Sequence, residues 1–238
     1  MPPAESWRVL LDLHRPTHEQ MAYDAQLAAE AVPTVRCFVW EPPAVSLGWK
    51  QPPPEWLQAR AWQATGLAAV TRPSGGGVAF HGSDVSVAVV VPRSAVLSLD
   101  QLMRAICDHT VRLCETYAAR ADALVDASAY GRVTHCLTEL SPYAVLLQGR
   151  KVAGFALRRY PNSWLIQGSL LVRPLPETLT RGLPATLQHE LQARAISLSE
   201  ATGTLIREQD VALRWTQQWA PWWETSQLYV QEHLAHAM

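Results

Sequence analysis

The stretch from Arg72 to Val91, RPSGGGVAFHGSDVSVAVVV, places three consecutive glycines just before a run typical of a buried β-strand. Glycine loses more backbone entropy on folding than any other residue, so ordering three in a row is costly. A fold that keeps them needs bare backbone here, either for a tight turn with a bulge or for close approach of a ligand. The tract has neither the GxxxxGK[ST] pattern of a P-loop nor a GxGxxG pattern opening a helix.

The segments around the glycines mix strand and helix patterns without regular alternation. Strands are expected near residues 7–13, 35–41, 44–49, 67–72 and 142–172, the last as three runs joined by short turns. Helices are expected after a Thr17-x-x-Gln20 capping box, at about 53–65, after an N-cap at Ser98, and toward the C-terminus. The pattern predicts one α+β domain over residues 1–238, with mixed or antiparallel sheets flanked by helices and a short helical tail from about 184.

Composition excludes several classes of protein. A hydrophobic content of 48%, 17% charged residues and a net charge of −1 are ordinary for a folded domain, and indicate neither nucleic acid nor an anionic membrane as a partner. The apolar run Val85–Val91 is far shorter than the ~18 residues that a membrane helix needs. The N-terminal residues lack the basic and apolar regions of a signal peptide, so we expect a cytoplasmic location.

The cysteines do not form a disulfide or metal pattern. Cys107 and Cys114 share one face of a predicted helix and are expected in the core, and Cys37 lies in a predicted strand. No CxxC pair or histidine cluster is present, so no metal site is expected. Cys136 lies in a less regular stretch and is either a free thiol at the start of a strand or a nucleophile.

Lysine is rare in this chain. Only Lys50 and Lys151 are lysines among 20 basic residues. A retained lysine is either chance or a site that needs a compact ammonium, which arginine does not replace. We expect Lys50 to be a surface residue.

Five short motifs, in order, resemble one known family. RPSGGGVAFHGSD resembles the RR(S/T)GGGxxxH motif of the lipoate–protein ligase A family and its octanoyltransferase relatives, and GRKVAGFALRR resembles their G(R/K)Kx(A/S)GSAQRR segment. MAYDAQLAAE, PPAVSLGWKQP and SWLIQGSLLV are similar to three further segments. The spacing of Cys136 and Lys151 resembles that of LipM-type octanoyltransferases. Ligases proper lack that cysteine and carry an accessory domain, for which the segment after Val172 looks too short.

The resemblance implies a biotin/lipoate protein ligase-like catalytic fold, related to class II synthetases, and a role in protein lipoylation. An octanoyl group would pass from octanoyl-acyl carrier protein to Cys136 as a thioester, and then to a lysine of a lipoyl domain or of glycine cleavage H protein. Lys151 would favour the thiolate and bind the acyl carbonyl. This transferase needs no cofactor. One alternative is an ATP- and magnesium-dependent ligase acting on free lipoate or octanoate; the other is a non-catalytic paralogue that binds lipoyl or acyl groups.

The resemblance also implies a set of substrate-binding residues. The glycines are expected to wall the acyl tunnel. Arg72 either orients the loop, pairs with an acidic group or is solvated, and His81 is a proton carrier, an orienting donor or a structural residue. The full set is Arg72, Ser74, Gly75, Gly76, Gly77, His81, Gly154, Phe155 and Ala156.

Four positions depart from the family pattern. Phe155 replaces a serine, Leu157 a glutamine and Gln167 a histidine, while Gly77 stands where LipM-type enzymes often have arginine. Phe155 is expected to narrow the acyl tunnel or to block a nucleotide pocket. Either effect weakens the ligase interpretation more than the transferase one.

Overall fold

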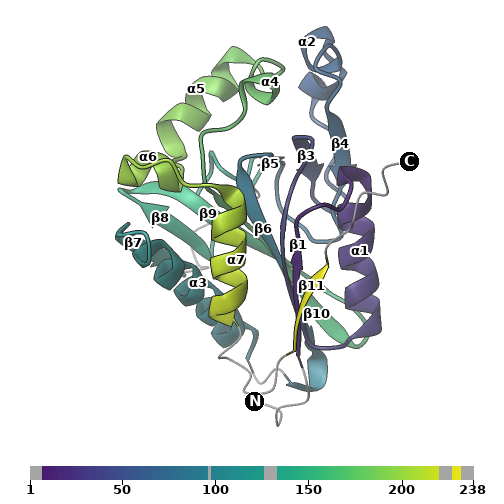
Figure 1. Cartoon of the computed structure of the whole chain (residues 1–238). Helices are drawn as coiled ribbons and strands as arrows, with labels where there is room; N and C mark the ends of the chain where they lie inside the picture. Colours follow the sequence, from purple (N-terminus) through teal and green to yellow (C-terminus); the bar gives the residue numbers. More distant parts are fainter. Residues whose placement is uncertain (1–6, 96–97, 126–132, 220–226, 232–238) are drawn as a thin grey trace, which may run out of the picture.

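A computed structural model describes residues 7–95, 98–125 and 133–219, together with the backbone of 227–231. An eight-stranded mixed sheet runs through the molecule in the order β11-β1-β2-β6-β10-β9-β8-β7 (Figure 1). β1 is parallel to β2 and β11, and the other neighbours are antiparallel. The strands are β1 (Arg8–Asp12), β2 (Thr34–Val39), β6 (Asp84–Pro92), β7 (Ala121–Leu124), β8 (Ala144–Leu147), β9 (Arg150–Arg159), β10 (Ser163–Leu171) and β11 (Gln227–Gln231).

A second sheet has three strands, β4 (Ala68–Thr71), β3 (Ala44–Leu47) and β5 (Ala79–His81), in the order β4-β3-β5. The chain passes from this small sheet to the large one in the two residues between β5 and β6. Gly82 makes that crossing at φ +121°, and a Cβ there would lie 2.6 Å from the Pro43 side chain. Only glycine fits such a backbone without strain.

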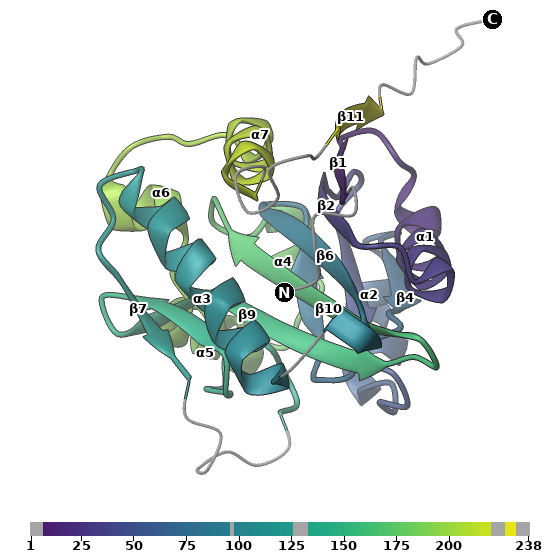
Figure 2. The ribbon, with the colours of Figure 1, turned by 90° about the horizontal axis from the view of Figure 1, so that it is seen from below.

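The longer helices cover both faces of the large sheet (Figures 1 and 2). α3 (Leu99–Glu115) and α7 (Glu208–Trp219) pack on one face of the large sheet, and the main core lies between them and that face. α1 (Thr17–Glu30) packs on the other face. Alternate strand residues supply the two cores, as the pleat requires. The remaining helices are α2 (Arg60–Gln63), α4 (Glu177–Thr180), α5 (Ala185–Arg194), α6 (Leu198–Thr202), η1 (Glu55–Gln58) and η2 (Arg93–Ala95).

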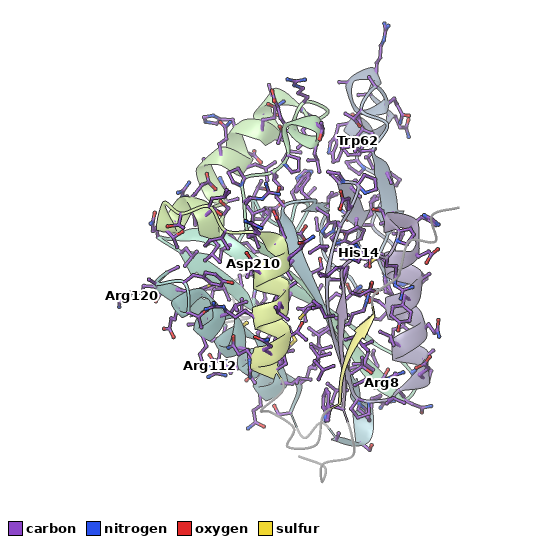
Figure 3. The ribbon with its side chains drawn as sticks, viewed as in Figure 1. Arg8, His14, Trp62, Arg112, Arg120 and Asp210 are labelled. Atoms are coloured by element: carbon purple, nitrogen blue, oxygen red, sulfur yellow. The ribbon has the colours of Figure 1, made fainter. Side chains whose placement is uncertain are left out.

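A third core lies between the small sheet and the helices at its end. Trp62 of α2, labelled in Figure 3, packs edge-on against Trp56 with ring centroids 5.2 Å apart. Leu179 and Leu187, from α4 and α5, join the same cluster. This cluster closes the end of the small sheet.

The predicted α+β class with mixed sheets is confirmed, with three local corrections. The Thr17 capping box is wrong: α1 begins without a side-chain cap, and the Thr17 hydroxyl donates to the Pro42 carbonyl instead. The helix expected at about 53–65 is two short pieces, η1 and α2. The helical C-terminal segment is followed by β11, which pairs with β1. Ser98 caps α3 as predicted, accepting from the Gln101 N–H.

A buried ion cluster fixes α1 against the large sheet. The fully buried guanidinium of Arg36 on β2 contacts Asp12 at 2.9 Å and Asp24 at 2.6 Å. Burial raises the pKa of Asp24, although Arg36 and Gln167 oppose that shift. Over the described residues, no helix is both long and apolar enough to cross a membrane.

Candidate active site

A cavity of about 40 Å³ lies where the two sheets meet. Both sheets contribute polar and apolar side chains to its lining. Of the substrate-binding residues expected from the sequence, five line it; Cys136 lines it too. The lining residues are Met21, Phe38, Trp40, Ser46, Arg72, Ala79, His81, Ser86, Val87, Cys136, Gly154, Phe155, Ala156, Gln167, Gly168 and Ser169.

The segment that carries Cys136 is tied to the end of the glycine tract. The Val78 N–H donates to the Thr134 carbonyl at 2.8 Å, and the Cys136 N–H donates to the Val78 carbonyl at 2.7 Å. A Cβ at Gly77 would stand 2.5 Å from the Thr134 carbonyl. Glycine at position 77 therefore lets the two backbones approach closely enough to hold Cys136 at the cavity.

Glu139, which was not singled out in the sequence, connects the cysteine segment to Lys151. Its carboxylate accepts from the backbone N–H groups of Thr134 and His135 at 2.9 and 3.0 Å. Its carbonyl accepts from the Lys151 ammonium at 3.0 Å. Position 139 thus orients both candidate catalytic groups.

Lys151 and Cys136 converge on a single point. A Cβ added at Gly154 would lie 3.2 Å from Lys151 Nζ and 3.3 Å from Cys136 Sγ. Lys151 is 1% exposed, and its ammonium donates to two neutral oxygens, the Glu139 carbonyl and the Ser141 hydroxyl. An ammonium has three N–H donors, so in this part of the structure one is left for a ligand.

Arg72 is a buried residue that braces the glycine loop. Its guanidinium donates to the carbonyls of Ser46, Gly75 and Gly77 at 2.9, 2.7 and 2.6 Å. The solvated alternative for Arg72 is therefore wrong, because the residue is buried, and its hydrogen bonds are those that the loop-orienting alternative requires. Burial lowers the pKa of Arg72, and a thiolate on Cys136 opposes that shift. A second positive charge thus lies near the cysteine.

The three glycines differ in what surrounds them, and none lines the cavity, contrary to the expected tunnel wall. Gly77 meets backbone, as described above. Gly76 has φ +90°, and a Cβ there would lie 3.0 Å from the Arg72 guanidinium. A Cβ at Gly75 would meet nothing within 4 Å. Glycines without a Cβ are needed in this tract chiefly because other parts of this chain pack closely against its backbone.

The hydrogen bonds of Gln167 account for a glutamine at the position where the family pattern has histidine. Its amide nitrogen donates to Asp24 on α1 at 2.6 Å, and its amide oxygen accepts from the Ser74 N–H at 3.1 Å. The side chain thus joins α1 to the start of the glycine tract. The Ser74 hydroxyl is buried with no hydrogen-bond partner among the described residues.

Phe155 fits because the residue opposite it is glycine. Phe155 on β9 is the register partner of Gly168 on β10, and a Cβ at Gly168 would lie 2.2 Å from the phenyl ring. The ring belongs to the main core, which Leu157 also contacts. Gly154 and Ala156, on either side in the strand, face the opposite way. Phe155 therefore belongs to the main core and also lines the cavity.

His81 lies in a chain of hydrogen bonds that sequence reasoning missed. Its Nε2 is 2.8 Å from Ser46 Oγ, and its Nδ1 is 2.9 Å from Asp84 Oδ2. His81 is 4% exposed, which agrees with a buried polar residue of the site. Ser46 and Asp84 each lie within motif segments, but their partners come from different strands.

The chain matches the family model described as the lipoyl protein ligase A/B catalytic domain over residues 16–220. The chain belongs to that family. Two relatives of this lipoyl ligase A/B domain carry the name octanoyltransferase LipM. The protein from Symbiobacterium thermophilum is 33% identical over 83% of this chain and 79% of its own length. The one from Kyrpidia tusciae is 28% identical over 87% of this chain and 83% of its own length.

Solved structures of similar fold include lipoate ligases. A crystal structure of lipoate-protein ligase A bound with ATP has a TM-score of 0.70 at 14% identity, covering 96% of this chain and 89% of that one. The bi-partite lipoate protein ligase of Thermoplasma acidophilum has a TM-score of 0.68 at 15% identity, covering 96% and 88%. At these identities the likeness demonstrates the fold of the lipoyl ligase A/B domain and nothing finer.

Proposed function

We propose that this protein is an octanoyltransferase that moves an octanoyl group from octanoyl-acyl carrier protein to a protein lysine, through a thioester on Cys136. The observation that carries the proposal is the convergence of Cys136 Sγ and Lys151 Nζ beside Gly154. The relatives named octanoyltransferase LipM support the same reaction class. The acceptor is a lysine of a lipoyl domain or of glycine cleavage H protein.

In the first step, the Cys136 thiolate attacks the thioester carbonyl of the donor. The new C–S bond forms, the bond to the carrier thiol breaks, and the carrier thiolate takes a proton from water. The positive charges of Lys151 and Arg72 favour the attacking thiolate. The free N–H of Lys151 donates to the carbonyl oxygen as it becomes an oxyanion. In the second step, the acceptor amine attacks the acyl-enzyme and Cys136 leaves as a thiolate.

The acyl chain would enter the cavity between the sheets. Met21, Phe38 and Val87 give that cavity apolar walls. Its volume of about 40 Å³ holds only a few waters, so an eight-carbon chain has to displace side chains as it enters. Such displacement favours a chain delivered from a carrier protein, which supplies binding energy outside the cavity.

Intact-protein mass spectrometry tests the proposal. The protein is incubated with octanoyl-acyl carrier protein without ATP or magnesium, beside Cys136→Ser and Lys151→Ala. We expect an octanoyl adduct on the wild type that hydroxylamine removes. Cys136→Ser should form no such adduct, or only an ester that hydroxylamine removes slowly. Lys151→Ala should acylate at least about 10²-fold more slowly, the usual loss for an oxyanion donor.

The same assay distinguishes the alternatives. If folded wild-type protein forms no adduct until ATP, magnesium and free lipoate or octanoate are added, the protein is a ligase and the proposal fails. If a lipoyl domain is modified under neither condition, the non-catalytic alternative holds. Normal acylation of Lys151→Ala would overturn the assigned role of the ammonium.

A further inference from the structure

Three polar side chains from three strands form a buried chain beside the candidate nucleophile. Ser46 of β3, His81 of β5 and Asp84 of β6 are each at most 4% exposed. The distances along the chain are 2.8 Å from Ser46 Oγ to His81 Nε2, and 2.9 Å from His81 Nδ1 to Asp84 Oδ2. The order hydroxyl, imidazole, carboxylate is the one by which enzymes polarise a hydroxyl group.

The surroundings of Asp84 determine the direction of these hydrogen bonds. Its carboxylate also accepts from the Gly82 N–H at 3.0 Å and from the hydroxyls of Ser86 and Ser169 at 3.1 and 2.6 Å. Burial acts to raise the pKa of Asp84, but His81, the Ser169 hydroxyl and the Gly82 N–H outweigh it and hold the pKa below its usual value. An ionised Asp84 only accepts, so His81 Nδ1 donates to it; in the neutral imidazole, Nε2 then accepts from the Ser46 hydroxyl.

The imidazole is held in one orientation between fixed neighbours. The Trp40 ring stacks on His81 with centroids 4.1 Å apart, and its N–H donates to Ser86. On the far side of Ser46, Arg72 donates to Ser46 Oγ at 3.2 Å. The titratable groups around His81 are thus Asp84 beside it, Arg72 beyond Ser46, and Cys136, which lines the same cavity.

We propose that Ser46, His81 and Asp84 are the proton relay that takes the proton from the attacking lysine amine in the second half of the reaction. The inference rests on the proposed octanoyltransferase function. A thiolate attacks without losing a proton, so the first half needs no base. An amine that attacks a thioester carries a surplus proton until a base removes it, and Ser46 lines the cavity that holds Cys136.

The acceptor lysine loses one proton to water and enters as a neutral amine. Its nitrogen forms the N–C bond, and a proton leaves that nitrogen for Ser46 Oγ while the Ser46 proton moves to His81 Nε2. The C–S bond then breaks and Cys136 leaves as a thiolate. The imidazolium, stabilised by Asp84, returns its proton to water through Ser46.

Single-turnover kinetics on isolated octanoyl-enzyme test the relay, with acylation and transfer to a lipoyl domain measured separately. The variants are Ser46→Ala and Asp84→Asn, with Ser46→Thr as the variant that keeps the hydroxyl. Asparagine keeps the shape of Asp84 but donates to His81 Nδ1, so Nε2 can no longer accept from Ser46. Ser163→Ala is the matched control, because Ser163 is also fully buried and donates to the Ala28 carbonyl at 2.6 Å.

We expect Ser46→Ala and Asp84→Asn to slow transfer by about 10²-fold near neutral pH, against a much smaller change in acylation. The loss of transfer rate in these variants should become smaller as pH rises, because hydroxide replaces the missing base. A merely structural defect would not depend on pH in this way. Ser46→Thr should recover part of the rate. If Asp84→Asn does not fold, the transfer rate of Ser46→Ala alone tests the relay.

Two results overturn the relay. If Ser46→Ala octanoyl-enzyme forms and transfers within about twofold of wild type and of Ser163→Ala, the base lies elsewhere and the octanoyltransferase proposal stands. If the wild type forms no acyl-enzyme at all, the proposed function fails and the relay fails with it.

Discussion

At the scale of single residues, the environment separates one cysteine from the other three. Cys37, Cys107 and Cys114 are buried, and burial raises the pKa of each thiol to about 12. Cys136 is only partly buried, lines the cavity and lies with Lys151 beside Gly154. A thiolate is the reactive form, so reactivity should follow these surroundings.

We therefore predict that iodoacetamide modifies the folded protein once, at Cys136. Peptide mass spectrometry should find no label on the folded Cys136→Ser variant and four labels on the unfolded chain, which has four cysteines. Lys151→Met should slow the labelling by about tenfold or more, because the nearby ammonium favours the thiolate. Labelling of a second cysteine in folded protein would contradict the prediction.

At the scale of elements, the glycine tract serves mainly as a surface on which other backbone packs. Gly48 allows a close backbone approach as Gly77 does, because a Cβ at position 48 would lie 2.0 Å from the Gly76 carbonyl. The cysteine segment, the turn after β3 and the guanidinium of Arg72 all reach the tract. Its bare backbone therefore positions the nucleophile even though it does not line the cavity.

Gly77→Ala and Gly75→Ala form a matched pair that tests this role. The methyl at position 77 would lie 2.5 Å from the Thr134 carbonyl, whereas the one at position 75 has open space. We expect Gly77→Ala to lower the free energy of unfolding by about 1–3 kcal/mol and to slow acylation of Cys136. Gly75→Ala should change both by little. Chemical denaturation with the adduct assay measures this, and equal tolerance of the two variants would refute it.

At the scale of the whole molecule, α3 and α7 cover one face of the large sheet (Figure 2). Met21, Phe38 and Trp40, which line the cavity, belong to the core on the other face. The two helices meet where His109 of α3 stacks on Trp219 of α7, with centroids 4.2 Å apart. Burial, with a smaller effect of Arg112, lowers the pKa of His109 from 6.5 to about 3. Protonation of His109 therefore opposes this packing.

Stability should consequently depend on pH through His109. Its folded pKa lies below its unfolded pKa, so its contribution is complete above about pH 6.5 and is lost as pH falls toward 3. The slope cannot exceed that of one proton, about 1.4 kcal/mol per pH unit. His109→Phe, which keeps a flat ring against Trp219, should lose less stability between pH 6.5 and 4 in thermal melts. An unchanged pH slope would show that His109 does not contribute.

Local pattern was enough to predict the fold class, most strands and the family, because those depend on residue order and spacing along the chain. The Cys136–Lys151 pair followed from the resemblance to that family and stays a prediction. The positions of Ser46, Glu139 and Asp84 in the site were not visible in this way, since their partners come from distant segments or from backbone atoms. The same holds for Gln167 and Phe155, whose departures from the family pattern make sense only beside Asp24 and Gly168. Contacts across two sheets depend on register and packing, and only the tertiary structure sets those.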